Sequence, residues 1–312
     1  MLLKNRKSNT ILGSFKKECG LVLLFFMYII YSTAHSQSRH IVVDSKDRTP
    51  VDFAAVICSN GNSIYTDSEG YFSMTYQAKD TLYLSRVGYK QFVLRCLFLK
   101  DTIFIESTNV LPEIVIKEKA KHSSTLWLGY LDKKNKGIYH PGNQAALRIE
   151  NPYGSPKQIK RVRFTFSKIK FDFSGNRNRV KSLAYIVRLR IYAIGSNGGP
   201  GQDLLQENST SEIGRYQRLI DFVVDSKNIY LPPEGCFVAI EFIGFVDEDK
   251  KFTSSTKKGK EAFIQFAILF VSQTGGKAQS WDKKDINAPW KIWSNMGSYQ
   301  PNFKFGVEIE SN

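Results

Sequence analysis

The sequence contains few of the side chains that metal ions and most catalytic sites use. Its 312 residues include only four cysteines and four histidines. No C-x-x-C pair and no H-E-x-x-H motif is present, so neither kind of zinc site is predicted. Beyond the first forty residues, His122 and His140 stand far apart, and His40 has no partner at metal-ligand spacing. We therefore predict no metal ion and no cofactor, and we expect the histidines to be incidental surface residues.

The motifs of common catalytic sites are also missing. There is no G-x-S-x-G elbow and no G-x-x-x-x-G-K-[ST] phosphate loop. The glycine-rich stretch Gly195–Gly201 is not followed by a helical pattern, which favours a hairpin loop over a nucleotide site. The acidic stretches Asp247–Asp249 and Asp282–Asp285 lack the fuller ligand series of a calcium loop. We predict no catalytic residue, but two carboxylates that the fold brings together would make a hydrolase, and this alternative stays open.

Long hydrophobic runs are scarce, and the longest lies near the N-terminus. It spans Leu21–Tyr31, follows a basic region, and precedes the small residues that end at Ser36. This order is typical of a secretory signal peptide over residues 1–36. The alternative is a retained anchor, but the run is shorter than the roughly 20 apolar residues that span a bilayer. We expect an exported protein of the periplasm, outer membrane or cell surface, with no transmembrane helix after cleavage.

Acidic residues are fewer than basic residues in this sequence. The leader holds five basic residues and one acidic residue, so its removal lowers the formal charge from +15 to +11. The basic residues are scattered, with short clusters at 157–163 and 257–260. We expect a solvated basic surface and, because of export, no nucleic-acid partner.

The three cysteines that follow the leader are Cys58, Cys96 and Cys236. An odd number cannot pair completely within one chain. Cys58 and Cys96 both lie in strand-like contexts, where a single bridge and buried free thiols remain alternative interpretations.

Helical periodicity is rare, whereas residues that favour strands are abundant. In the N-terminal part, short apolar stretches alternate with turn residues such as Asn60-Gly61. Expected strands cover 40–44, 50–58, 64–66, 71–76, 80–85, 92–98 and 102–106. This spacing predicts a small β-sandwich over residues 38–116.

The same region resembles a known family. The matching stretches are Val42–Asp44, Pro50-Val51, Ala54–Val56, Thr66-Asp67, Glu69–Phe72, Asp80–Leu82, Ser85 and Gly88-Tyr89. Their order is similar to that of the carboxypeptidase regulatory-like domain, which implies a transthyretin-like β-sandwich and no catalytic residue. This domain also precedes the plug of TonB-dependent outer-membrane receptors, and Leu111–Ile116 resembles the stretch that follows it there. Fewer than 200 residues remain, too few for a plug and a large barrel, so we expect the front module without the transport machine.

The rest of the chain also has strand character. A charged linker is expected over 117–140, followed by a second domain over 141–312. Apolar alternation predicts strands at 159–173, 183–194, 219–224, 236–245, 262–271 and 302–309. We predict an all-β protein in which the small transthyretin-like sandwich is followed by a larger jelly-roll-like β-sandwich of eight to ten strands in two sheets, with a closed barrel as the alternative.

Aromatic residues near the C-terminus provide the one candidate binding feature. Trp281, Trp290, Trp293 and Tyr299 lie within nineteen residues. On loops they would make a stacking platform for sugars, whereas in the interior they would cap the core. The resulting hypothesis is an exported, non-enzymatic binding protein of the bacterial cell envelope that recognises a glycan or an envelope partner. The alternatives are an exported hydrolase and an accessory protein of a TonB-dependent uptake system.

Overall fold

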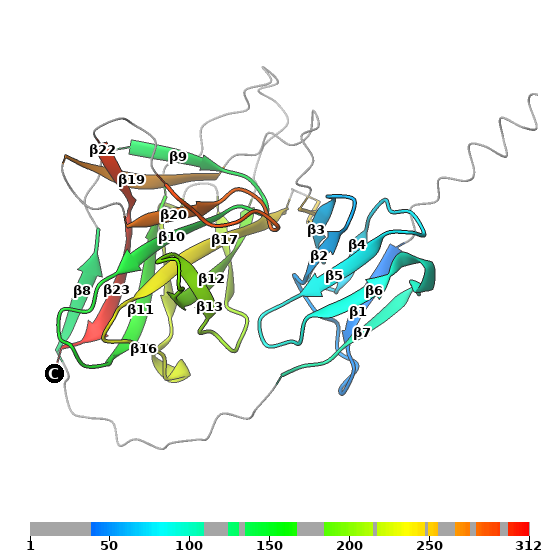
Figure 1. Ribbon diagram of the computed structural model, residues 1–312, viewed down its shortest axis with the longest axis horizontal. Coiled ribbons are helices and arrows are strands. Elements are labelled where there is room, and N and C mark those ends of the chain that lie inside the picture. The colour runs from blue at the N-terminus through cyan, green and yellow to red at the C-terminus, as the bar shows by residue number, and fades with distance from the viewer. Residues whose placement is uncertain are drawn as a thin grey trace, which may run out of the picture. The chain divides into compact units, whose positions relative to one another are not determined.

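Strands dominate the regular structure of the protein (Figure 1). The computed structural model describes residues 39–108, 124–130, 135–166, 184–214, 217–246, 249–254, 266–274, 279–293 and 299–311, with the backbone alone for 135–138, 266–274 and 299–301. Within these ranges the helical elements are two 3-10 turns, Cys96–Phe98 and Asp225–Lys227. The prediction of an all-β fold is confirmed. No helix in this part of the chain is long and apolar enough to cross a bilayer, and the predicted leader lies outside it.

The first seven strands form two sheets, which we call the first sandwich. They are β1 (Arg39–Asp44), β2 (Ala55–Cys58), β3 (Ser63–Tyr65), β4 (Tyr71–Ser73), β5 (Thr81–Ser85), β6 (Phe92–Arg95) and β7 (Thr102–Ile105). One sheet has the order β4-β1-β7 and the other β3-β2-β5-β6. Their inward residues share one apolar core that includes Val42, Val56, Phe72 and Leu82. β1 and β7 pair in parallel, a long-range contact between the two ends of the module.

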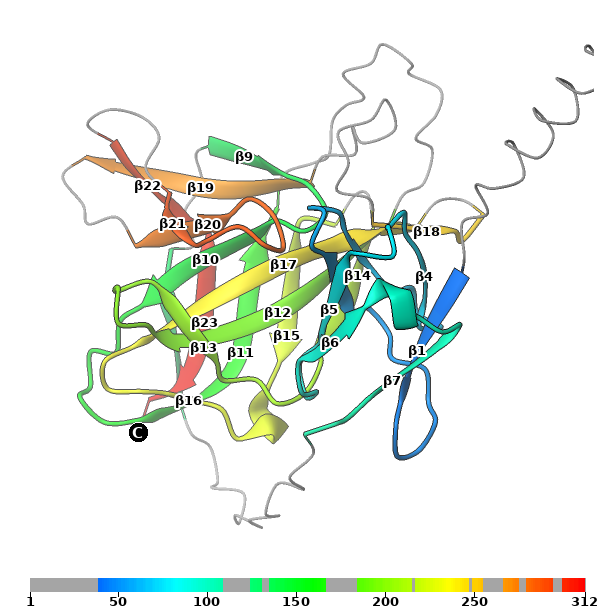
Figure 2. The same cartoon turned by 45° about the vertical axis from the view of Figure 1, so that its right-hand side comes forward.

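The largest sheet of the molecule, here the main sheet, has eight strands (Figure 2). Its path is β13 (Pro200–Asp203), β12 (Ala184–Ile194), β17 (Cys236–Val246), β10 (Gln144–Ile149), β20 (Ser280–Lys283) and β21 (Lys291–Ile292), with β14 (Thr210–Gly214) on β12 and β18 (Phe252–Thr253) on β17. The long strands β12 and β17 form its antiparallel centre.

Two further sheets complete the C-terminal part. The five-stranded sheet contains β15 (Leu219–Val223), β11 (Lys157–Thr165), β23 (Phe305–Glu310), β8 (Thr125–Gly129) and β16 (Tyr230–Leu231). The three-stranded sheet contains β22 (Tyr299–Phe303), β19 (Phe266–Thr274) and β9 (Asn135–Tyr139). Apolar residues of the main and five-stranded sheets, among them Val187, Phe242, Phe164 and Val307, form one core cluster.

The predicted strand count for this part was too low. The described residues hold sixteen strands, β8 to β23, in three sheets instead of eight to ten in two. Many of the additional strands have two to five residues, which is too short for a period-two pattern to appear in the sequence. Two of them, β8 and β9, lie within the stretch expected to be linker and pair with β23 and β19. The jelly-roll connection order and the domain boundaries stay predictions.

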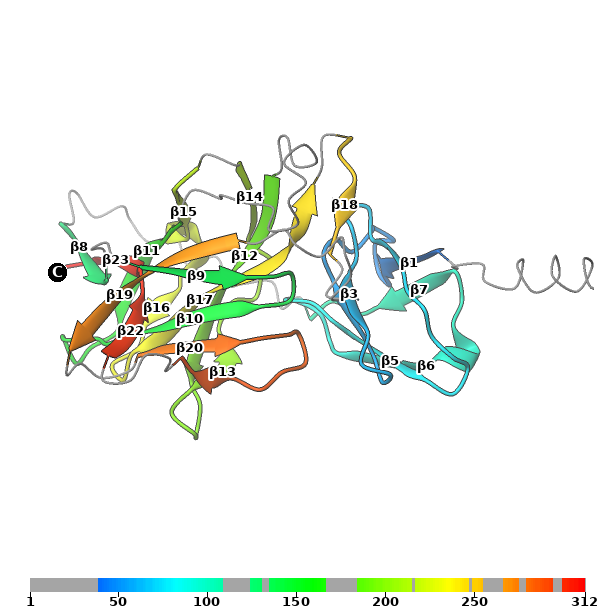
Figure 3. The same cartoon turned by 90° about the horizontal axis from the view of Figure 1, so that it is seen from above.

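The two faces of the main sheet have different neighbours. On β12, Tyr185, Val187 and Leu189 point to the core, whereas Ile186 belongs to a second cluster with Ile243 of β17. That second cluster also contains Ala55 and Tyr65 of the first sandwich. Residues His40–Asn312 accordingly form one compact unit. We call the contact between the first sandwich and the outer face of the main sheet the junction; β3 and β18 lie beside it in Figure 3.

Candidate functional site

A cluster of buried charges lies at the junction and is built around Glu241. β17 places Glu241 opposite Arg188 of β12, so that both side chains project from the outer face of the main sheet. Arg188 Nη1 and Arg190 Nε lie 3.2 and 2.8 Å from Glu241 Oε2. From the first sandwich, the Tyr65 hydroxyl donates to Glu241 Oε1 at 2.6 Å. The side chains of Arg188 and Glu241 are 0% and 2% exposed, so this carboxylate is held entirely by protein groups.

Charges this deeply buried are stable only when their hydrogen bonds are satisfied. Arg188 Nε donates to Asn208 Oδ1 at 2.7 Å, and its Nη2 donates to the carbonyl of Phe53 in the first sandwich. Arg190 Nη1 forms an ion pair with Asp203 at 2.7 Å. The cluster therefore ties β12, β17 and the loop that carries Phe53 together.

The electrostatics of the cluster indicate a structural role. Burial by itself would raise the pKa of Glu241, but the guanidinium groups of Arg190 and Arg188 outweigh it and lower the pKa to about 2. Burial and the Glu241 charge raise the pKa of Tyr65 well above its ordinary value. Glu241 thus stays ionised and Tyr65 stays protonated, so neither is poised to exchange protons near neutral pH.

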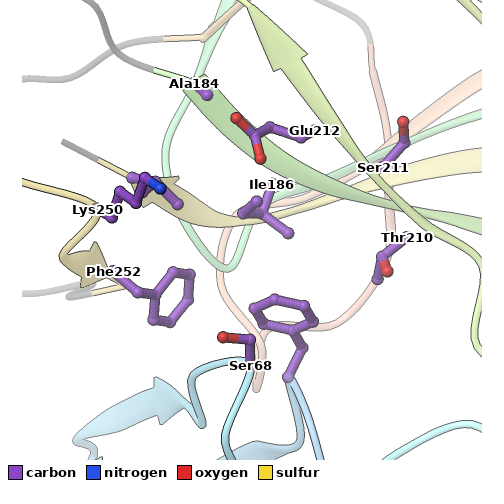
Figure 4. Close-up of a pocket in the computed structure, with 10 residues that line it drawn as sticks. Ser68, Ala184, Ile186, Thr210, Ser211, Glu212, Lys250 and Phe252 are labelled. Carbon is purple, nitrogen blue, oxygen red and sulfur yellow. The ribbon is translucent and has the colours of Figure 1, made fainter. Parts of the chain in front are cut away.

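Next to this cluster is an open cavity of about 920 Å³ (Figure 4). Its lining combines apolar side chains with hydroxyl and charged groups: Phe53, Ser68, Ala184, Ile186, Thr210, Ser211, Glu212, Val246, Lys250 and Phe252. The first two come from loops of the first sandwich, and the others from β12, β14, β17, β18 and the connection before β18. The cavity has the volume of a small-molecule site, and its lining is polar and apolar in nearly equal parts.

Two aromatic rings form one wall of the cavity. Phe53 and Phe252 lie 5.5 Å apart between ring centroids, at an interplanar angle of 59°. Opposite them, Glu212 and Lys250 direct their charged groups into the cavity (Figure 4). Within the described parts of the chain, neither charged group has an ion-pair or hydrogen-bond partner. The cavity therefore offers an apolar surface and two solvated charges of opposite sign.

Backbone strain coincides with this site. Among the described non-glycine residues, four have positive φ, and Phe53 (49°) and Lys250 (59°) are two of them. A bulky side chain rarely adopts this left-handed conformation. The Phe53 amide donates to Asp67 O at 3.3 Å, and its carbonyl accepts from Arg188. The buried cluster thus helps to hold the Phe53 ring in the cavity wall.

The structure places the four predicted binding residues in different surroundings. Trp281 packs on Phe237 and Trp290 on Tyr192, with centroid distances of 6.2 and 5.5 Å, in one cluster on the outer face of the main sheet. Trp293 stacks on Phe303 in the core at 4.4 Å and 19°. Tyr299 lies in β22, and its side chain is outside the described residues. Trp281 and Trp290 are therefore brought together and Trp293 is not, while sugar binding by these residues stays a prediction.

The three described cysteines and His40 are buried in the protein interior. Cys58, Cys96 and Cys236 are free and buried, which settles the two interpretations in favour of thiols in this structure. Burial raises the pKa of Cys236 to about 12, so its thiol is not a nucleophile. The expectation of a surface position was wrong for His40, which is 2% exposed and contacts Lys100 O at 2.9 Å. No cluster of three or more potential metal ligands exists among the described residues.

Sequence reasoning missed the residues of the cavity. They come from several separate segments, so no local spacing connects them. Glu212 sits in a five-residue strand whose sequence, Thr-Ser-Glu-Ile-Gly, has no distinctive pattern. The one useful signal is indirect, because β12 carries Arg188 and Arg190 among apolar residues and such residues require buried partners.

Comparisons with known proteins leave the function open. No known protein family and no curated protein matches the chain. One similar solved structure is that of the cysteine protease and lectin-like domains of Cwp84, a surface layer associated protein of Clostridium difficile, at 11% identity and a TM-score of 0.32, covering 81% of this chain and 46% of that one. Another is the infectious bursal disease virus Gx strain structure, at 11% identity and a TM-score of 0.22, covering 83% and 57%. The chain spans about half the length of these proteins, and likenesses this low carry no argument. Fold and cavity together define the protein as an all-β protein with an amphiphilic cavity at an internal junction.

Proposed function

We propose that the protein is an exported, non-enzymatic binding protein of the bacterial cell envelope, and that its junction cavity receives a glycan. The observation that carries this proposal is the lining of the cavity. The Phe53 and Phe252 rings face a space that is also bordered by the hydroxyls of Thr210 and Ser211 and by the Glu212 carboxylate. A sugar ring has an apolar face that stacks on aromatics and a rim of hydroxyls that needs polar partners.

Binding is favoured over hydrolysis by the carboxylates of the same site. Glycoside hydrolysis uses two carboxyl groups on either side of the scissile bond. Among the described lining residues, Glu212 supplies one carboxylate and no second one faces it. Glu241, which lies two strands from Glu212 on β17, has its carboxylate bound by Arg188 and Arg190.

The proposal is tested by measuring the affinity of the purified protein for soluble fragments of envelope polysaccharide by calorimetry. Replacement Phe252→Ala removes one ring of the cavity wall, and we expect about a tenfold or larger loss of affinity. Phe104→Ala is the matched control, because Phe104 is an exposed phenylalanine of β7 that does not line the cavity. Trp290→Ala tests the predicted aromatic platform separately.

Equal affinity of the wild type and Phe252→Ala, or no binding of any envelope fragment, would contradict the proposal. Loss of binding in Trp290→Ala with none in Phe252→Ala would move the site to the outer face of the main sheet. Fractionation of the producing cells tests the export that the N-terminal pattern predicts.

A further inference from the structure

The two charged groups in the cavity restrict the chemistry of its ligand. Glu212 extends from β14 and Lys250 from the connection that precedes β18, and Figure 4 shows both end groups directed into the same space. Neither has an ionic partner within the described residues. Both side chains are exposed to water, in contrast to the buried Glu241 and Arg188 at the same junction, which are hydrogen-bonded to protein groups.

A ligand that fills the cavity displaces water from both charged groups. Removing a carboxylate or an ammonium from water is unfavourable unless an opposite charge or several hydrogen bonds replace the water. A neutral sugar supplies hydroxyls and compensates this loss only in part. A ligand with one cationic and one anionic group compensates both charges and also fixes its own orientation.

We infer that the ligand is a zwitterionic glycoconjugate, an oligosaccharide that bears a short peptide with a free ammonium and a free carboxylate. Its ammonium pairs with Glu212, its carboxylate pairs with Lys250, and its sugar lies against the Phe53 and Phe252 rings. This inference rests on the proposed function and names the ligand class of the same cavity. The volume of about 920 Å³ is at the upper end for small-molecule sites and accommodates a conjugate of this kind.

The experiment compares a conjugate with its sugar after the peptide has been cut off, a step that removes the ammonium and leaves one carboxylate on the sugar. Disaccharide-peptides released from bacterial cell wall by a muramidase are titrated into the full protein, next to the same disaccharide after an amidase has removed the peptide. We expect the conjugate to bind about tenfold or more tightly than the peptide-free sugar, with a preference that decreases as salt concentration rises.

Charge variants assign the preference to the two residues. Glu212→Gln and Lys250→Gln are each expected to reduce the preference about tenfold and to leave the affinity for the peptide-free sugar nearly unchanged. The controls are Lys90→Gln and Glu106→Gln, which break an exposed ion pair of 2.8 Å in the first sandwich that does not line the cavity. All four side chains are exposed, so the variants should fold, which thermal unfolding verifies.

The possible failures are distinguishable. Equal affinity for the conjugate and the peptide-free sugar, with both lost in Phe252→Ala, would overturn the zwitterion and leave the glycan site. An unchanged preference in Glu212→Gln and Lys250→Gln would overturn the assignment of the charges. No binding of either ligand or of larger envelope glycans would overturn the glycan site together with this inference.

Discussion

Glu241 is the residue at which the hydrogen bonds of the junction converge. It accepts hydrogen bonds from Arg188 and Arg190 of β12 and from Tyr65 of β3. The first two partners flank it in the main sheet, so they would remain nearby without the first sandwich. The Tyr65 hydroxyl is the contribution of the first sandwich, and its removal tests how much the contact between the two parts depends on one hydrogen bond.

For Tyr65→Phe we expect the free energy of unfolding to fall by about 1 to 3 kcal/mol. The variant lacks the hydroxyl that donates to Glu241 Oε1, so this buried oxygen loses a hydrogen bond. Urea unfolding measures this change. Tyr83→Phe is the control, since Tyr83 is 37% exposed on β5 and its loss of a hydroxyl should change stability by less than about 0.5 kcal/mol. Equal stabilities of Tyr65→Phe and the wild type would show that the Tyr65–Glu241 contact is energetically neutral.

Glu241 also predicts a dependence of stability on pH. Its pKa is lowered from 4.5 to about 2 in the folded protein, so its contribution is complete above pH 4.5 and is lost as the pH falls toward 2. The size of this loss is on the order of 3 kcal/mol. The neighbouring Asp203 changes the pH dependence of stability in the opposite direction. Burial raises its pKa in the folded protein despite the nearby Arg190, so ionisation of Asp203 disfavours the folded state.

A comparison of the wild type with Glu241→Gln isolates this one group. The variant should be less stable at pH 7, and the difference in free energy of unfolding should narrow steadily between pH 4.5 and pH 2. Urea unfolding at several pH values measures it. A difference that stays constant over this range would show that folding does not lower the pKa of Glu241.

Elements of the structure were predictable from the sequence wherever a strand is long enough to show its alternation. β5, β12 and β17 were expected at 80–85, 183–194 and 236–245 and lie at Thr81–Ser85, Ala184–Ile194 and Cys236–Val246. The stretch expected as one strand over 302–309 is interrupted at Lys304 and belongs to β22 and β23 in two different sheets. Local alternation reports which residues face a core, but it does not report which strand is the neighbour.

The candidate site was less predictable than the strands for the same reason. The cavity depends on contacts between distant segments, such as Phe53 beside Phe252. The tryptophans are close together along the chain, which made them conspicuous in the sequence. In the fold, however, Trp281 and Trp293 pack on opposite sides of the main sheet. Proximity in sequence predicts a shared surface poorly when the chain changes sheets within a few residues.

The glycine-rich hairpin between β12 and β13 gives a prediction at the scale of an element. Gly195–Gly201 is a hairpin turn, as the sequence indicated, and Gly195 N donates to Gly199 O at 2.7 Å. A Cβ at Gly199 would lie 2.6 Å from the Trp281 ring, so the glycine is required for the close contact between hairpin and ring. We expect Gly199→Ala to lower the free energy of unfolding by about 1 to 3 kcal/mol through overpacking.

Gly214→Ala is the matched control for this substitution. Gly214 ends β14, has no atom near the position of an added Cβ, and should tolerate alanine within about 0.5 kcal/mol. Urea unfolding followed by tryptophan fluorescence measures both variants. An unchanged midpoint for Gly199→Ala would mean that the hairpin moves away from Trp281 at little cost.

At the scale of the whole unit, the junction joins the two parts through apolar and polar contacts together. The apolar cluster of Ala55, Tyr65, Ile186 and Ile243 lies next to the Glu241 cluster. Backbone contacts add to them, since Tyr65 N donates to Ser254 Oγ at 2.9 Å. The cavity lies beside these contacts and is lined from both parts, so its shape depends on the junction being closed.

This coupling predicts that residues His40–Asn312 unfold in a single cooperative transition. Calorimetry should give one peak whose calorimetric and van't Hoff enthalpies agree. The double variant Tyr65→Ala, Ile243→Ala removes an aromatic ring and a buried aliphatic side chain from the junction, and we expect it to separate the peak into two. Val223→Ala with Tyr83→Ala is the control, because both side chains are exposed and lie outside the junction cluster. Two peaks in the wild type would show that the first sandwich folds independently of the main sheet. The cavity would then lie between two parts that can separate, and it would not be a preformed site.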